Sequence, residues 1–435
     1  MRLIKKTLFA IFTICAISGH VVAAEDKLPN WQEDTLTGDW GGVRADLYKK
    51  GISLGFTHKS DFLATTSGGL KRGSAWLGHT EARLTLDLEK LLGWSGTTAY
   101  AVYHSDLGSK FNSHYVGAFT GVDNIEVGTN TALFYQAWVQ KNFLDDHVSL
   151  LAGLYAIDTE FYVAETAGIF LQPPYGMANE FAQTGVNGPP IFPLGALAAR
   201  LKLTSPDGRF YAQAALSDGV PGDPNNPRGT HIKLGGGDGT LSIVEFGYTP
   251  HEESLSIEQA EHGELTPAQL NVHEQAESFN KTAIGFWRYS AKFDAIDGSA
   301  SRHHSQGAYI MAERTLFMEK DHPSQGLAGF VRFGVTSDDV NQEDWSGSIG
   351  LRYHGLIPGR DDDIAGLAFT VNHAGDRYRR ANASERQETQ FEATYRAQIA
   401  PYFAIQPTLQ LISNPNMDPT IRNAWIVGSR FEVEF

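Results

Sequence analysis

The chain ends in the stretch Asn423-Ala-Trp-Ile-Val-Gly-Ser-Arg-Phe-Glu-Val-Glu-Phe435, in which two kinds of side chain alternate. One set is apolar and the other is charged: Trp425, Val427, Phe431, Val433 and Phe435 against Arg430, Glu432 and Glu434. A period of two is typical of a β-strand with unlike faces. A soluble sandwich buries the apolar face, whereas an outer-membrane barrel turns it to lipid and lines a lumen with the polar face. Alternation alone leaves both architectures open.

Similar runs of about ten residues recur along the chain, separated by turn residues. Their number is even, as a bacterial single-chain barrel requires. We expect sixteen strands, near 52–61, 78–90, 95–104, 131–143, 147–156, 196–203, 209–216, 240–250, 281–293, 306–318, 327–336, 345–356, 362–374, 388–400, 402–411 and 421–435.

The connections between these runs fall into two length classes. Short turns such as 90–93, 144–147 and 205–208 alternate with long segments, which are 105–130, 157–195 and 217–239. Short periplasmic turns and long outer loops are a barrel signature that a sandwich has no reason to show. The predicted fold class is therefore all-β, a 16-stranded antiparallel transmembrane β-barrel of the bacterial outer membrane.

Composition narrows the function classes. The 435 residues include 45 glycines and 11% aromatics, and 35 Lys and Arg against 50 Asp and Glu give a net charge of −15. This acidic balance argues against nucleic acid as a partner. The longest uncharged stretch, 182–199, contains three prolines and cannot be a continuous membrane helix.

The first residues have the layout of a secretory signal. Arg2, Lys5 and Lys6 precede a short apolar run, and small residues lead to a cleavage site after Ala24. We therefore expect a signal peptide over 1–24, and loss of its three positive charges takes the net charge from −15 to −18. The single cysteine, Cys15, lies in this segment, so the exported chain must gain stability from a large core or closed sheet.

Several motifs in order along the chain resemble those of the carbohydrate-selective porins of the OprB type. They are Leu36-Thr-Gly-Asp-Trp-Gly-Gly-Val-Arg44, Asp158-Thr-Glu-Phe161, Gly355-Leu-Ile-Pro-Gly-Arg-Asp-Asp-Asp363 and Tyr395-Arg-Ala-Gln398. The similarity covers nearly all of the mature chain. It implies a sixteen-stranded outer-membrane channel for sugars and similar small polar solutes, and it implies a monomer. The terminal Phe435 is similar to the last-strand signal of outer-membrane proteins.

The expected organisation follows from these observations. A periplasmic N-terminal segment over 25–51 precedes the barrel over 52–435, and 157–195 forms a constriction loop inside it. Residues 251–280 depart from the resemblance because they are longer than the usual connection. We expect a periplasmic insert there, with a short helix starting near Thr266-Pro267; a solvated acidic loop is the alternative.

Enzyme motifs are mostly absent. His251-Glu252 and His273-Glu274 lack the second histidine of a zinc protease, and no serine-hydrolase elbow is present. His303-His304 and Asp361-Asp362-Asp363 are interpreted as a solvated loop and a charged turn. We predict no catalytic residues, no metal site and no cofactor, although an outer-membrane barrel enzyme and a secreted β-sandwich lectin stay open as alternatives.

The candidate solute site combines charged lumen residues with aromatic rings. Alternation places Arg83, Arg200 and Lys202 inward, and Asp158 and Glu160 stand where strand 147–156 meets the long segment. Charged donors, carboxylates and rings give the weak sites that a passing sugar needs. The alternative is that these cations belong to a row of lumen charges that does not contact solute.

Aromatic side chains of the long segment are candidate platforms for sugar rings, with packing inside the loop as the alternative; the two selected are Phe170 and Tyr175. The expected partners are outer-membrane lipid and glucose-like carbohydrates, with no nucleic acid. Hydroxylated organic acids such as quinate are the other candidate solutes.

Overall fold

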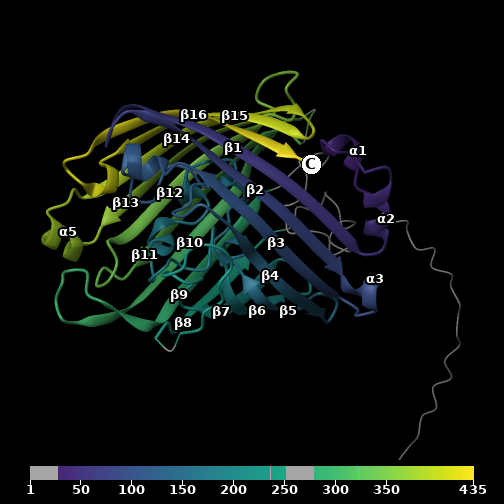
Figure 1. Ribbon diagram of the computed structural model, residues 1–435, viewed down its shortest axis with the longest axis horizontal. Helices are drawn as coiled ribbons and strands as arrows, with labels where there is room; N and C mark the ends of the chain where they lie inside the picture. Colours follow the sequence, from purple (N-terminus) through teal and green to yellow (C-terminus); the bar gives the residue numbers. More distant parts are fainter. Residues whose placement is uncertain (1–27, 236, 251–278, 321, 323) are drawn as a thin grey trace, which may run out of the picture.

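The computed structural model describes residues 28–235, 237–250, 279–320, 322 and 324–435. Sixteen strands pair antiparallel with their sequence neighbours, and β16 pairs with β1 to close a barrel (Figure 1). This confirms the predicted fold. The strands are β1 (Ile52–Gly69), β2 (Gly73–Asp87), β3 (Thr97–Gly108), β4 (Thr131–Phe143), β5 (Val148–Tyr155), β6 (Ala196–Thr204), β7 (Phe210–Asp218), β8 (Thr240–Tyr248), β9 (Asn280–Asp294), β10 (Arg302–Met318), β11 (Gly326–Thr336), β12 (Glu343–His354), β13 (Ile364–Ala374), β14 (Gln387–Ala400), β15 (Phe403–Ser413) and β16 (Arg422–Glu434).

Several strand ends differ from the prediction. The strand predicted over 78–90 is wrong beyond Asp87, where helix α3 (Leu88–Leu92) begins. Asp87 Oδ1 accepts hydrogen bonds from the backbone N–H groups of Glu89 and Lys90, and Gly93 ends the helix with φ of 73°. An Asp cap and a left-handed glycine are the usual helix boundaries. Two other strands are longer than predicted: β3 continues to Gly108 and β1 continues to Gly69.

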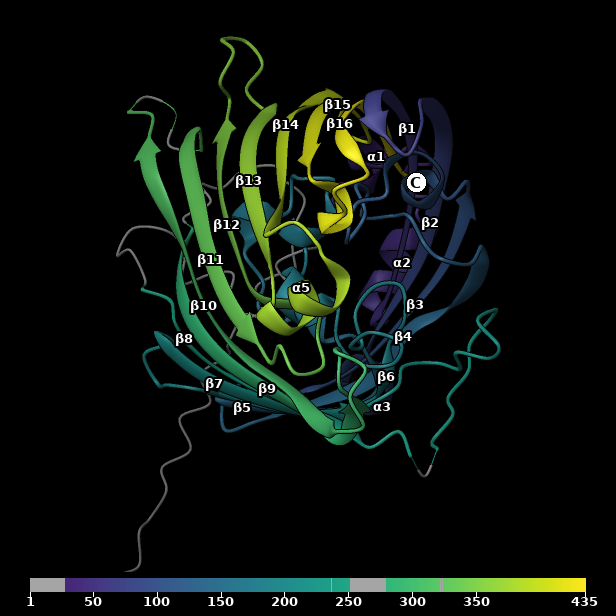
Figure 2. The same cartoon turned by 90° about the vertical axis from the view of Figure 1, so that its left-hand side faces the viewer.

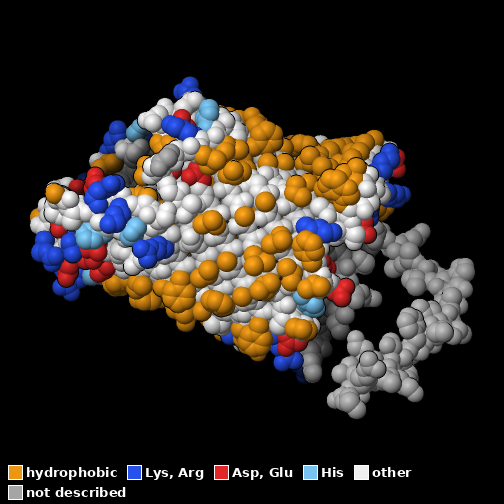
Figure 3. All heavy atoms as spheres, turned by 90° about the horizontal axis from the view of Figure 1, so that it is seen from below, with side chains coloured by type: hydrophobic (Ala, Val, Ile, Leu, Met, Phe, Trp, Pro, Cys, Tyr) orange, Lys and Arg blue, Asp and Glu red, His pale blue; other side chains and the backbone are white. Residues whose placement is uncertain are grey.

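The two faces of each strand meet different surroundings. On β6, Leu197, Leu201 and Leu203 are 41%, 39% and 44% exposed, whereas Arg200 points inward and is 3% exposed. Figure 3 shows rows of hydrophobic side chains along the barrel wall, with charged side chains gathered toward its two ends. Such an apolar band flanked by charge matches an outer-membrane barrel. Within the described residues, no helix has both the length and the apolar character to cross a membrane.

The two described chain ends lie at the same end of the barrel, called here the terminal end (Figure 1). Helices α1 (Trp31–Asp34) and α2 (Val43–Lys49) lie there. The backbone N–H of Leu36 donates to Glu434 O at 2.8 Å, and the Arg44 guanidinium donates to Phe435 O. The expected signal peptide (1–24) and nearly all of the expected insert (251–278) lie outside the described residues.

The opposite end, called the loop end, carries the long connections and helix α5 (Asp376–Asn382) (Figure 2). The remaining helical turns are η1 (Asn112–Val116), η2 (Ile157–Thr159), η3 (Glu165–Ala167), η4 (Pro173–Tyr175), α4 (Asn179–Ala182) and η7 (Pro415–Met417). Four of them belong to the segment 157–195, which lies inside the ring of strands in Figure 2 and contributes half of the aromatic members of the largest buried cluster.

Candidate functional site

The segment 157–195, called here the inner segment, is tied to the barrel wall through its main chain. Glu245 on β8 accepts a hydrogen bond from Tyr162 N at 2.8 Å, and Glu313 on β10 accepts from Thr166 N at 3.0 Å. Glu392 on β14 accepts from two consecutive amides, those of Leu171 and Gln172, both at 2.9 Å. Irregular backbone at membrane depth needs internal partners, and these three wall carboxylates supply them.

Side chains of the barrel wall also donate hydrogen bonds to the backbone carbonyl groups of the inner segment. Arg332 on β11 donates to Gly176 O at 3.1 Å and to Tyr175 O. Lys281 on β9 donates to Val163 O at 3.0 Å, and Gln406 on β15 donates to Ile169 O at 2.6 Å. Wall side chains therefore satisfy both kinds of backbone group along the inner segment.

Aromatic packing fills the space between the inner segment and strands β9 to β11. The Tyr162 ring stacks on Tyr309 with centroids 3.7 Å apart. The candidate platforms Phe170 and Tyr175 lie 4.8 Å apart in the same packing and are each 1% exposed. The structure therefore places both rings in the interior packing rather than on a surface that faces solute.

Arg200 and Glu160 form a two-pronged ion pair at the start of the inner segment. Arg200 Nε and Nη2 donate to the two Glu160 carboxylate oxygens, both at 2.8 Å. The remaining guanidinium contacts go to Ser149 on β5 and Gln140 on β4, and the Tyr155 hydroxyl donates to Glu160. All three guanidinium nitrogens are thus engaged, and Nε and Nη2 hold the inner segment against the wall through Glu160.

Asp158 and Lys202 make contacts of their own beside that pair. The Asp158 carboxylate accepts from the Tyr135 hydroxyl at 2.8 Å and from Phe192 N at 2.9 Å, which closes the inner segment's two ends onto each other. Burial raises the pKa of Asp158 to about 6. Lys202 Nζ lies over the Tyr211 ring, 5.4 Å from its centroid.

Residues 109–130 form a second inward segment, within the stretch 105–130 that the sequence predicts as a long outer loop. Asn124 N donates to Leu171 O of the inner segment at 2.7 Å, and Arg430 on β16 donates to Asn124 Oδ1 at 2.6 Å. Arg430 also makes a buried ion pair with Asp61 on β1, with the closest nitrogen and oxygen 2.6 Å apart. The two inward segments therefore contact each other, and the second one also contacts the wall at β16.

Arg83 belongs to a row of six partly exposed charged side chains on β14, β16, β1 and β2, called here the charge ladder: Arg396, Glu432, Glu434, Lys59, Glu81 and Arg83. Their side chains are between 19% and 32% exposed. Arg83 lies 3.4 Å from Glu81 and 3.2 Å from Glu434, and Glu432 lies 2.9 Å from Arg396 and 3.4 Å from Lys59. Cations and carboxylates alternate, so their formal charges cancel.

Between the two inward segments lies a cavity of about 530 Å³, called here the vestibule. Its lining includes Asn124, Glu126, Asp158, Asn187 and Phe192. This volume falls in the range of small-molecule sites, which combine apolar walls with a few placed polar groups. Burial raises the pKa of Glu126 to about 7, even though its carboxylate accepts two contacts from Asn112 N.

Comparison with known proteins agrees with this geometry. At 21% identity, the alignment with Porin B of Pseudomonas aeruginosa covers 99% of this chain and 98% of that protein. The candidate porin QuiX of Acinetobacter baylyi is 24% identical, over 98% of this chain and 99% of its own. A high-pH structure of Pseudomonas putida OprB superimposes with a TM-score of 0.79 at 18% identity, covering 93% of this chain and 99% of that one.

The family described as carbohydrate-selective porin, OprB family, matches residues 71–435, which is most of the chain. That match, the closed barrel and its polar lumen exclude the β-sandwich and the barrel enzyme that the sequence left open. The chain therefore belongs to the carbohydrate-selective porins of the OprB family, and it is a channel of the bacterial outer membrane.

Proposed function

We propose that this porin passes glucose-like sugars without net charge, which contact the vestibule first and the charge ladder next. The observation that carries the proposal is the charge balance of the ladder, in which three cations face three carboxylates. A neutral sugar finds hydrogen-bond donors and acceptors there in alternation. An anion finds each cation already paired and a carboxylate beside it.

The candidate residues divide between contact and support in this proposal. Arg83 is the sequence-selected residue that meets solute, because its side chain is 24% exposed in the lumen. Arg200, Glu160 and Asp158 hold the inner segment in place and set the width of the constriction that it forms. Lys202 lies over Tyr211 and adds positive charge beside this support.

Quinate is the second candidate solute, since the candidate porin QuiX resembles this chain over nearly its whole length. Liposome swelling with glucose and quinate under matched conditions separates the two. We expect faster swelling with glucose, because quinate is an anion. Faster swelling with quinate would overturn the assignment of a neutral solute.

A pair of variants sharpens this test. Replacing Glu81 and Glu432 with glutamine leaves three cations and one carboxylate in the ladder, so the quinate rate should rise relative to glucose. Glu33→Gln removes the same chemistry from α1 at the terminal end, outside the lumen, and should leave the ratio unchanged. An unchanged ratio in the double variant would remove the ladder from the solute path.

We further propose that a single chain makes a complete channel and that the terminal end faces the periplasm. The inner segment, the vestibule and the ladder all come from one barrel, which supports the first point. The short turns at the terminal end support the second. Native mass spectrometry in detergent tests the first, with a trimer as the contrary result, and protease accessibility on intact cells of a site engineered near Asp207 tests the second.

A further inference from the structure

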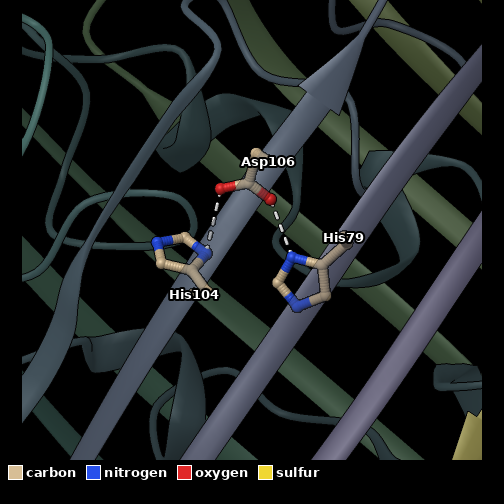
Figure 4. A group of neighbouring side chains, drawn as sticks. All are labelled: His79, His104 and Asp106. Atoms are coloured by element: carbon tan, nitrogen blue, oxygen red, sulfur yellow. Dashed lines mark hydrogen bonds and ion pairs between the residues drawn. The ribbon is translucent and has the colours of Figure 1, made fainter.

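Two histidines and an aspartate gather on the lumen face of adjacent strands. His79 lies on β2, and His104 and Asp106 lie on β3 (Figure 4). The strand register places His79 directly opposite Asp106 and places Glu81 directly opposite His104. Side chains two residues apart share a strand face, so the four form a compact square on the wall.

The distances in this group are short. His79 Nδ1 lies 2.7 Å from Asp106 Oδ1, and His104 Nδ1 lies 3.0 Å from Asp106 Oδ2. The three ligand-type atoms lie within 4.8 Å of one another, and among the described residues this is the one such group of three. His104 and Asp106 are fully buried, and His79 is 7% exposed.

Several polar atoms here are left without hydrogen-bond partners among the described residues. The backbone carbonyl of Pro193 is beside the His104 ring, but the two ring nitrogens of His104 and the Oδ2 atom of Asp106 are buried and make no hydrogen bond of good geometry. The 3.0 Å contact between His104 and Asp106 lacks hydrogen-bond geometry. Buried polar atoms in that state are costly, and each one in a native protein calls for an explanation.

A bound cation explains all of these features together. We propose that His79, His104 and Asp106 bind a divalent transition-metal ion of the Zn²⁺ class. Two imidazole nitrogens and one carboxylate oxygen are ligands that Zn²⁺ takes, with a fourth position left for water. Such a site does not depend on which solute the channel passes.

The geometry needs only a small adjustment. A tetrahedral ion with bonds near 2.1 Å separates its ligand atoms by about 3.4 Å. His79 Nδ1 and Asp106 Oδ1, now 2.7 Å apart, must therefore part by roughly 0.7 Å. The other ligand atoms, which lie within 4.8 Å of one another, must close toward the same separation of about 3.4 Å. The Phe192 ring, with its centroid 5.5 Å from both imidazoles, covers the group with an apolar lid.

A supporting carboxylate is also in place. Glu81 Oε2 lies 3.7 Å from His79 Nε2, the ring nitrogen opposite the one that would bind the metal. Metal-binding histidines usually direct their second nitrogen to a carboxylate or carbonyl, and loss of that partner weakens metal binding about 10–100-fold. Phe192 and Asp158 line the vestibule, so an ion would reach the site from the vestibule.

Co²⁺ titration of the folded porin in detergent tests the proposal, because Co²⁺ reports its ligands by visible absorption. We expect saturable binding of a single Co²⁺, displaced by Zn²⁺ and abolished in His104→Gln and Asp106→Asn. Glu81→Gln should weaken binding about 10-fold. Heat-modifiable migration on a gel verifies that each variant remains a folded barrel.

His104→Cys gives a test that does not depend on loss of binding. The exported chain has no other cysteine, so a thiolate-to-cobalt absorption band would identify position 104 as a ligand. His373→Gln is the matched control, since His373 Nδ1 also lies 2.7 Å from an aspartate, Asp344, and it should bind Co²⁺ as the parent does. Absence of saturable binding in the parent protein would establish a metal-free hydrogen-bonded cluster and overturn the proposal.

Discussion

Replacing Arg200 with alanine should both destabilise the folded barrel and widen the channel. The change leaves Glu160 without its two 2.8 Å contacts and leaves Ser149 and Gln140 without their donor. Breaking a buried ion pair from one side costs about 3–5 kcal/mol. The Glu160 side chain keeps 18% of its surface exposed, so we expect the lower end, about 3 kcal/mol.

The assay is urea unfolding of the porin in detergent, combined with single-channel conductance in planar bilayers. Glu160→Gln and the variant with both substitutions complete a double-mutant cycle. If Arg200 and Glu160 interact directly, the cycle should give a coupling energy of about 1–3 kcal/mol. Conductance should rise in Arg200→Ala because the inner segment loses its hold on β6. A coupling energy near zero together with unchanged conductance would refute the assignment of Arg200 and Glu160 as supports of the constriction.

Three further predictions address selectivity, pH and assembly. Arg83→Ala should lower the free energy of unfolding by less than about 1 kcal/mol, because the ion pairs of Arg83 are partly exposed. The same variant should shift the reversal potential toward cation selectivity and weaken the block of ion current by sugar. Unchanged ion selectivity would contradict this prediction. Burial raises the pKa of Asp158 to about 6 and that of Glu126 to about 7, so cation selectivity should rise as pH increases from 5 to 8, and Glu126→Gln should flatten the upper part of that curve. The free energy of unfolding should change in the opposite direction and fall as pH rises, because a carboxyl group with a raised pKa in the folded state stabilises the fold when it is protonated. The stabilisation from Glu126 is full below about pH 4 and is lost as pH rises through about 7. Urea unfolding at several pH values would measure this loss. Deleting Phe435, whose N–H donates to Phe56 O at 2.8 Å, should lower the amount of folded barrel in membranes without changing conductance per channel; normal membrane levels would argue against a role in assembly.

The strands were predictable because lipid and lumen impose a period of two on every one of them. Their ends were less so, because the alternation weakens where strands leave the membrane. The prediction ended one strand at residue 104, whereas β3 continues to Gly108. Asp106 was therefore read as part of a loop, and the pairing of His79 with Asp106 could not be anticipated. The sequence signal was present, as His-x-Glu on one strand and His-x-Asp on the next.

The site was harder to predict than the fold. Glu392 contacts Leu171 across 221 positions of sequence, and nothing in the local pattern distinguishes it from Glu432, which pairs with Arg396 instead. The alternation predicts that both side chains point into the lumen, but it does not predict which groups they contact there. The same limit applies to Phe170, since a ring in a loop reads the same whether it packs inside or faces solute.

The wall carboxylates bind main-chain amides of the inner segment. The position of this segment and the identity of its side chains can therefore evolve separately. Every amino acid except proline offers an amide, so the main-chain anchors at Glu245, Glu313 and Glu392 persist when the segment's side chains change, although Glu313 also accepts a hydrogen bond from the Thr166 hydroxyl at 3.0 Å. Side chains on the vestibule side, such as Gln183, can therefore be exchanged while the scaffold stays in place. A lineage of such channels can acquire new solutes by substitution at those positions, and an engineer can do the same, provided that proline is kept away from positions 162, 166, 171 and 172.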